Sequence, residues 1–317
     1  MPARSVATRN SLQRRAVWED ARRRILRHWQ LYLLILPPVL YILIFRYFPM
    51  YGLQLAFKEY NYRLGYWGSP GVGLKHFVLF FKSYYFTRLI GNTIGISLYS
   101  IAAGFLPPIL LAIALNECTS GGYKKLVQLV TYAPYFLSTV VVVGIIMQLL
   151  SLNGAVNGIL KMLGVEPVSF LSRASLFKSI YVWSGIWQGM GYSAIIYLAA
   201  LSAINPELYE AAIIDGANIW KRIWYIDVPG ILPTAIILLI LSTAGVLNVG
   251  FEKVYLMQNP LNLKTSDVIS TYVYRVGLVD MNYSFATAVG LFQSVVSFLF
   301  LTTVNQIARR FGETSLW

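Results

Sequence analysis

Residues 205–229 read NPELYEAAIIDGANIWKRIWYIDVP, a polar stretch set between two long apolar runs. Asn205 followed by Pro206 is a typical helix start, because the asparagine side chain can accept a hydrogen bond from a free backbone N–H and proline suits the first turn. Gly216 can end this helix in a left-handed conformation, and Asn218 can cap a second one. The stretch therefore predicts two short helices joined by a turn.

The chain around this stretch is strongly apolar. Hydrophobic residues make up 57% of the 317 residues and charged residues 12%, whereas a soluble domain carries about 25% charged residues. A helix needs about 20 mainly apolar residues to cross the roughly 30 Å hydrocarbon core of a bilayer. Six stretches qualify: 31–48, 89–115, 126–150, 176–203, 229–251 and 284–305. We therefore predict an all-α integral membrane protein with about six transmembrane helices.

Basic residues gather ahead of the first apolar run. Eight of the 26 Lys and Arg residues lie in the basic segment 1–30, and such a cluster favours a cytoplasmic location beside membrane lipid rather than nucleic-acid binding. The run 31–48 is followed by Pro49 and not by a small-residue cleavage site, so we expect a retained helix and not a signal peptide. With six spans, both termini and the 204–228 loop then face the cytoplasm. The aromatic-rich 49–88 loop is expected to form a folded cap on the outer face.

A helix–turn–helix on the cytoplasmic face suits docking to another protein. Its apolar side chains can fill a groove on a partner, while Glu210 and Asp215 can pair with basic residues there. These apolar side chains are Ala211, Ala212, Ile213, Ile219, Trp220, Ile223 and Trp224. An amphipathic connection that rests on the membrane surface would show the same pattern, so patterning alone leaves both interpretations open.

The 204–228 loop and the residue that follows it carry a run of motif residues: Glu210, Ala211, Ala212, Asp215, Gly216, Ala217 and Pro229. This pattern resembles the EAA loop of ABC-importer permeases, which has E-A-A, then D-G-A, then a hydrophobic pair that ends in proline. Val228 stands where leucine is more usual. The resemblance implies that the seven residues couple a permease to an ATP-hydrolysing subunit.

Other parts of the chain extend this resemblance. The sequence WQGMGY at 187–192, followed by LAAL at 198–201, looks like the span that precedes the EAA loop in sugar permeases. The sequences FPMYG at 48–52, WGSP at 67–70 and GLKHF at 73–77 resemble the polysaccharide and oligosaccharide branch of these permeases. Alginate-importing permeases belong to that branch, so the resemblance implies an oligosaccharide as the substrate.

The resemblance also implies a place in a larger assembly. Residues 31–317 would form the transmembrane domain of one permease subunit of a binding-protein-dependent ABC importer in a bacterial cytoplasmic (inner) membrane. The partners would be a second permease subunit, a dimer of ATP-binding subunits and an extracytoplasmic solute-binding protein. The chain has no Gly-Lys dipeptide and hence no G-x-x-x-x-G-K-[ST] phosphate loop. We therefore expect ATP and magnesium on the partner ATPase, and neither an enzyme activity nor a cofactor in this chain.

Polar and aromatic residues in the predicted spans are candidates for a translocation pathway. Polar groups at membrane depth are costly and often functional, and the flat faces and hydroxyls of sugars suit aromatic rings and amides. The candidates are Gln148, Trp183, Trp187, Gln188, Tyr192 and Asn248. Further polar residues in or beside the spans are Asn92, Glu252, Lys253 and Gln293. The alternative for each is structural, because amides also bond neighbouring helices and aromatic rings often only fill space.

The sequence leaves the charge of the sugar open. The outer segments 49–88, 152–178 and 257–283 hold ten basic residues and four acidic ones, and a basic outer mouth favours an anionic ligand such as a uronate oligosaccharide. An acidic binding protein would explain the same bias and leaves a neutral oligosaccharide as an alternative.

Other classes of membrane protein fit the sequence less well. An ion-driven secondary transporter would need paired ionisable residues or broken helices at mid-membrane, whereas most charges here fall near span ends. A membrane-embedded enzyme would need a cluster of acids, histidines or nucleophiles. The chain has only Cys118 and two histidines, His28 and His76, which argues against both a disulfide framework and a metal site.

Overall fold

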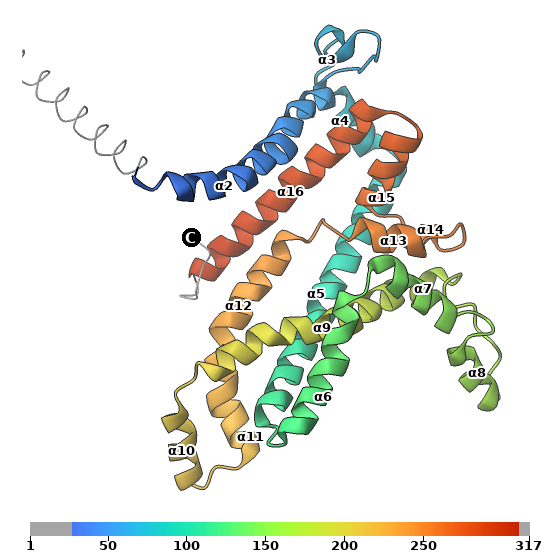
Figure 1. The fold of residues 1–317 in the computed structure, drawn as a ribbon. Helices are drawn as coiled ribbons and strands as arrows, with labels where there is room; N and C mark the ends of the chain where they lie inside the picture. Colours follow the sequence, from blue (N-terminus) through green and yellow to red (C-terminus); the bar gives the residue numbers. More distant parts are fainter. Residues whose placement is uncertain (1–26, 311–317) are drawn as a thin grey trace, which may run out of the picture. The chain divides into compact units, whose positions relative to one another are not determined.

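The computed structural model describes residues 27–310, and these are almost entirely helical (Figure 1). The one β pairing among them is an isolated bridge between Lys58 and Gly71. The chain forms two units, Met1–Gln54 and Leu55–Trp317. The all-α class predicted from the sequence is confirmed.

The first unit contributes α2 (Trp29–Ile42), which continues through a π turn (Leu43–Tyr47) into a 3-10 segment that begins at Phe48. None of the side chains of α2 is buried. A helix that is apolar all round is typical of a membrane span, because lipid or partner helices surround it. This helical segment lies where the first span was predicted. Most of the predicted basic segment, residues 1–26, lies outside the described residues.

The second unit is built around two long helices, α5 (Tyr85–Glu117) and α9 (Ala174–Ser202), which pack against each other and cross at an angle (Figure 1). α12 (Val228–Ala244) packs against both of them, and α16 (Tyr283–Arg310) packs against α12. Small buried residues lie where α5, α9 and α12 meet: Ala112, Ala194 and Ala235. Small side chains let helix backbones approach closely, which is the usual means of helix packing in membranes.

The predicted span 126–150 is broken. It folds as α6 (Gly121–Tyr132), a 3-10 turn and α7 (Thr139–Leu149), and the two arms are bent by 105°. Pro134 in the turn has no N–H with which to continue the helix, and the Ser138 side chain caps α7 by accepting a backbone hydrogen bond. The prediction of one continuous helix was wrong, because hydropathy does not register a stop and a new start within an apolar run.

The predicted span 229–251 ends early. α12 stops at Ala244, and a turn bounded by Gly245 and Gly250 follows. Glycine weakens a helix because it loses more backbone freedom than other residues when it is ordered. Three short helices come next: α13 (Phe251–Met257), α14 (Leu263–Ser266) and α15 (Ile269–Tyr274). Asn248 therefore lies in a turn rather than within a helix.

By length and composition, four helices of the described chain can cross a membrane: Trp29–Phe57, Tyr85–Glu117, Ile219–Thr243 and Tyr283–Ile307. The bent α6–α7 pair is a fifth if it counts as one span. α9 is long enough, at 29 residues, but its Ser, Gly, Gln and Trp residues make it less apolar. A helical membrane protein is thus confirmed, and the number of six spans stays a prediction.

Residues 55–88 form a folded element of the second unit. α4 (Lys75–Lys82) buries His76 and Phe80, and the Tyr60 N–H donates to Ser284 Oγ at 2.9 Å. The Lys75 ammonium donates to the Glu59 carboxylate at 2.7 Å, and this hydrogen bond lowers the pKa of Glu59. The side of the membrane that this element faces stays a prediction.

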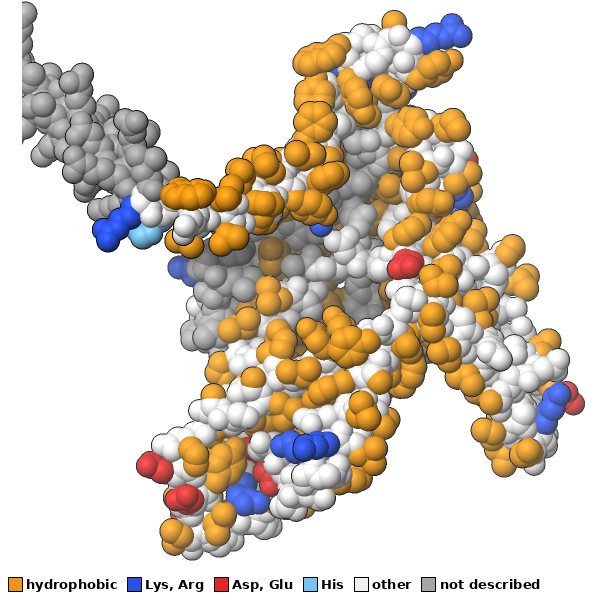
Figure 2. Space-filling view, viewed as in Figure 1, with side chains coloured by type: hydrophobic (Ala, Val, Ile, Leu, Met, Phe, Trp, Pro, Cys, Tyr) orange, Lys and Arg blue, Asp and Glu red, His pale blue; other side chains and the backbone are white. Residues whose placement is uncertain are grey.

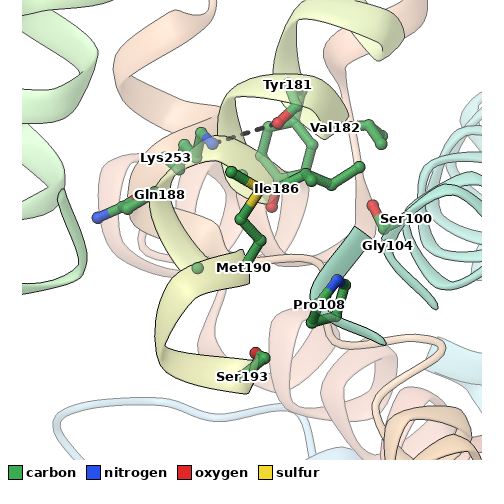
Figure 3. Close-up of a pocket in the computed structure, with 12 residues that line it drawn as sticks. Ser100, Gly104, Pro108, Tyr181, Val182, Ile186, Gln188, Met190, Ser193 and Lys253 are labelled. Carbon is green, nitrogen blue, oxygen red and sulfur yellow. Dashed lines mark hydrogen bonds between the residues drawn. The ribbon is translucent and has the colours of Figure 1, made fainter. Parts of the chain in front are cut away.

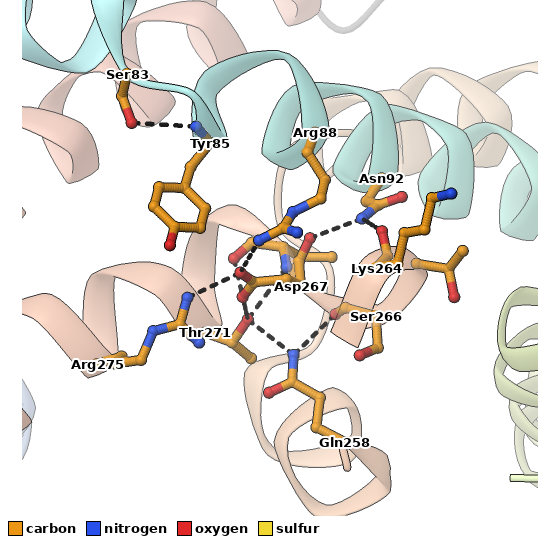
Figure 4. A network of polar contacts seen from close by, with 12 residues as sticks. Ser83, Tyr85, Arg88, Asn92, Gln258, Lys264, Ser266, Asp267, Thr271 and Arg275 are labelled. Carbon is orange, nitrogen blue, oxygen red and sulfur yellow. Dashed lines mark hydrogen bonds and ion pairs between the residues drawn. The ribbon is translucent and has the colours of Figure 1, made fainter. Parts of the chain in front are cut away.

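A buried carboxylate connects α5 to α14 and α15 (Figure 4). Asp267 is fully buried and forms ion pairs with Arg275 at 2.8 Å and Arg88 at 3.7 Å. The Thr271 hydroxyl donates to Asp267 Oδ1 at 3.2 Å, and the Asn92 amide donates to the Asp267 backbone carbonyl at 3.0 Å. A buried charge is stable only with such partners. Asn92 therefore has a structural role in this network.

Candidate functional site

The EAA loop, residues 204–228, begins with α10 (Pro206–Ile214). The Asn205 side chain caps this helix, because its Oδ1 accepts a hydrogen bond from the Glu207 N–H at 3.0 Å. The helix ends before Gly216, whose φ of +71° is a conformation that other residues adopt only with strain. Both helix ends are those predicted from the sequence.

The second helix of the loop is continuous with the span that follows. α11 (Ile219–Arg222) begins at the predicted cap Asn218, whose Oδ1 accepts from the Lys221 N–H at 2.9 Å. A π turn (Ile223–Asp227) then leads directly into α12. Pro229 lies in the first turn of α12, at the start of the span that follows the loop. The wide π turn can accommodate the proline ring and its missing N–H.

The seven motif residues are spread along this loop. Glu210, Ala211 and Ala212 lie on α10, Asp215, Gly216 and Ala217 form the turn, and Pro229 opens α12. The Glu210 and Asp215 side chains are exposed. Large apolar side chains beside them are exposed as well: Ile213, Ile214, Trp220, Trp224 and Tyr225. Figure 2 shows acidic, basic and apolar side chains over the part of the molecule that holds α10 and α11. Exposed apolar side chains of this kind mark a surface for a protein partner or for a membrane.

Two polar contacts hold the EAA loop in place, one between α10 and the π turn of the loop and one from the loop to α5. The Tyr209 hydroxyl on α10 donates to Asp227 Oδ1 at 2.5 Å, and Asp227 is fully buried. Burial raises the pKa of the Tyr209 hydroxyl well above its usual range, and the bond to the carboxylate raises it further. Arg222 donates to Glu117 at the end of α5 at 3.1 Å. None of these four residues is predicted as a contact from the sequence, because partners 18 and 105 positions apart leave no local pattern.

Three adjoining cavities lie between α5, α9 and α12 (Figure 3 shows the first). Their volumes are about 340, 370 and 280 Å³. The second shares Ser100 and Ser193 with the first, and the third shares Ser100 and Tyr181 with it. The polar lining consists mainly of hydroxyls and amides: Ser97, Ser100, Gln188, Ser193, Ser242 and Asn248. Such a cleft can exchange many weak hydrogen bonds with a hydroxyl-rich ligand.

The structure brings two of the six predicted pathway residues to this cleft. Gln188 lines the first cavity and Asn248 the third. The other four lie elsewhere. Trp183 Nε1 donates to the Tyr99 hydroxyl at 3.0 Å, and Tyr192 stacks on Tyr135 with ring centroids 4.0 Å apart. The exposed Trp187 and Gln148 line none of the three cavities. The roles of all six stay predictions.

Lys253 on α13 also lines the first cavity. Its ammonium donates to the Tyr181 backbone carbonyl at 3.2 Å and lies 5.0 Å from the centroid of the Tyr181 ring. The residue is 9% exposed, and burial lowers the pKa of its amine to about 8. The sequence showed Lys253 only as a polar residue next to a span, because the turn that brings α13 beside α9 was not predicted.

These features define a class of protein: a helical membrane protein with a polar cleft between its long helices and an exposed helix–turn–helix loop has the features of a transporter. The chain belongs to the family described as binding-protein-dependent transport system inner membrane component, which matches residues 108–313. It is a permease component of an ABC transporter and not an enzyme.

Relatives match nearly the whole chain. Protein LplB of Bacillus subtilis (strain 168) is 42% identical over 288 residues, which is 90% of this chain and 91% of LplB. The polygalacturonan/rhamnogalacturonan transport system permease protein YteP of the same organism is 40% identical over 295 residues, with 93% and 92% covered. A crystal structure of a bacterial alginate ABC transporter, in complex with an alginate pentasaccharide-bound periplasmic protein, contains a chain that is 43% identical with a TM-score of 0.84. This match covers 92% of our chain and 98% of that chain. The resemblance to alginate-importing permeases is thereby confirmed.

Proposed function

We propose that this chain forms half of the pathway of an ABC importer that carries an acidic, uronate-type oligosaccharide across the bacterial cytoplasmic membrane. The similarity to YteP and to the alginate transporter supports this substrate class, because it extends over about nine-tenths of the chain at 40% and 43% identity. Polygalacturonan and alginate are both chains of sugar acids with a carboxylate on each unit. The basic outer segments favour the same class of substrate.

The cleft between α5, α9 and α12 is the proposed route. Its serine hydroxyls and amide groups can bond sugar hydroxyls, while Pro108 and Ile186 offer apolar surface for a ring face. A transport pathway must bind its substrate weakly enough to release it. Many weak hydrogen bonds meet this requirement better than a tight pocket would.

The EAA loop is the proposed docking site for a dimer of ATP-binding subunits, which hold the ATP and magnesium. Its exposed apolar side chains suit a groove on the partner, and Glu210 and Asp215 suit basic residues at the groove's edge. In this arrangement the loop and both termini face the cytoplasm, a second permease subunit completes the pathway, and an extracytoplasmic solute-binding protein delivers the sugar.

Uptake by the reconstituted importer tests the substrate class. The complex is placed in proteoliposomes with ATP trapped inside, and binding protein with tetragalacturonate or a neutral glucose tetrasaccharide is added outside. We expect ATP-dependent uptake of the acidic sugar at least tenfold faster than that of the neutral one. Equal uptake of both sugars would favour a neutral-oligosaccharide importer. Uptake that follows an ion gradient without ATP would favour a secondary transporter.

A further inference from the structure

The proposed pathway contains a positive charge that the described part of the chain does not neutralise. Of the described residues that line the three cavities, Lys253 alone is charged. The ion pairs found within residues 27–310 involve other side chains. The buried carboxylate of Asp267, by contrast, has two arginine partners.

The geometry leaves the Lys253 ammonium able to bind a ligand. An ammonium has three N–H donors, and one of them is used by the Tyr181 carbonyl. Gly185 lies next to it: a Cβ at this position would be 3.4 Å from Lys253 Nζ. Because glycine has no side chain, this side of the Lys253 amine stays accessible to a ligand. Gln188 of α9 lines the same cavity, but its amide points away from the ammonium (Figure 3) and donates to the Leu137 carbonyl at 3.3 Å.

A buried ammonium without a counter-charge is costly, because burial removes its hydration. A cation–π contact and one carbonyl only partly replace that hydration. An anion that enters the cavity would replace it better. The proposed substrate carries a carboxylate on each unit, which is such an anion.

We infer that Lys253 is the residue of the pathway that binds the carboxylate of a uronate unit in transit and so selects acidic over neutral sugar chains. This inference rests on the proposed function. A lysine suits the task, because it offers a point charge on a flexible stem instead of the rigid bidentate grip of an arginine. The hydroxyls of the same sugar chain can then reach Ser100 and Ser193 in the adjoining cavities.

The test compares two sugars and four forms of the full importer in proteoliposomes. The sugars are tetragalacturonate and its methyl ester, which has the same shape without the charges. The forms are wild type, Lys253→Met, Lys253→Arg and, as a matched control, Lys161→Met, which removes a charge from an exposed lysine of α8 (Ala155–Met162). The measured quantity is the ratio of acid uptake to ester uptake, at saturating binding protein. A variant that merely folds poorly lowers both rates and leaves this ratio unchanged.

We expect the ratio to fall at least tenfold in Lys253→Met, to be largely kept in Lys253→Arg and to match wild type in Lys161→Met. A wild-type ratio in Lys253→Met would overturn the inference while leaving the proposed function in place. A wild-type ratio in Lys253→Met is also the result expected if Lys253 pairs with an acidic residue of the second permease subunit and not with the sugar. A wild-type importer that carries the ester but not the acid would overturn the proposed function itself.

Discussion

Gly191 shows how one residue sets the distance between two helices. A Cβ at this position would lie 2.1 Å from the Thr131 carbonyl oxygen of α6, which is backbone and cannot turn aside. Gly189, one half-turn earlier on the same helix, has nothing within 4 Å of the corresponding position. The glycine at 191 is therefore required by the contact between α6 and α9, whereas the one at 189 is not.

A pair of alanine substitutions tests this contact. Gly191→Ala should lower the free energy of unfolding by about 1–3 kcal/mol or more, because the added methyl group forces the helices apart. Gly189→Ala, the matched control, should not lower it and can raise it by about 0.5–1 kcal/mol, because alanine favours a helix over glycine. Thermal unfolding of the detergent-solubilised protein measures the difference. Equal melting temperatures for the two variants would contradict the close approach of α6 and α9.

The position of α10 within the EAA loop depends on a contact between two elements. Tyr209 on α10 is the hydrogen-bond donor to Asp227 at the start of α12, and Asp227 Oδ2 has no partner in the described structure. Removal of the tyrosine hydroxyl would leave the whole buried carboxylate unsatisfied. Unsatisfied buried polar groups cost about 1–3 kcal/mol, and charged ones more.

Tyr209→Phe is therefore expected to loosen α10. Limited proteolysis of the EAA loop should become several-fold faster, and ATP-driven uptake should fall with it. Tyr225→Phe is the control, because Tyr225 lies in the same loop and is 74% exposed; its loss of a hydroxyl should have little effect. Equal proteolysis rates for the two variants would show that the Tyr209–Asp227 bond does not hold the loop.

The elements differ in how far the sequence predicts them. The ends of α10 and the start of α11 follow from Asn205, Gly216 and Asn218, because helix caps depend on a few adjacent residues. The long apolar helices follow from composition in the same way. The break at Ser138 was not predicted, since the apolar run continues on both sides of it.

Most features of the site that could not be predicted from the sequence are contacts between residues far apart in the chain. The Tyr209–Asp227 bond and the approach of Lys253 to Tyr181 join residues 18 and 72 positions apart. No local pattern marks either pair. Of the predicted pathway residues, only Gln188 and Asn248 line the cleft, because hydropathy identifies polar residues in a span but not the direction in which each side chain points.

The chain connectivity of the second unit links the cleft to the EAA loop. α9 and α12 both line the cavities, and the loop runs from the end of α9 to the start of α12. α5, the third wall, is tied to the loop by the Glu117–Arg222 ion pair. A partner that moves the loop would therefore move all three walls of the cleft. Docking and transport can in this way be coupled through rigid helices, with typical coupling free energies of about 1–3 kcal/mol.

The central claim is that this chain works only as part of an ATP-driven assembly. The most direct measurement is purification of the tagged chain in mild detergent, with identification of every polypeptide that remains bound. We expect an ATP-binding subunit and a second permease subunit with the wild-type chain. Glu210→Lys should lose the ATP-binding subunit, because it reverses a charge on the exposed face of α10, whereas Glu166→Lys, the same change at an exposed residue outside the loop, should keep it. A chain that purifies alone and still imports sugar on an ion gradient would contradict the account.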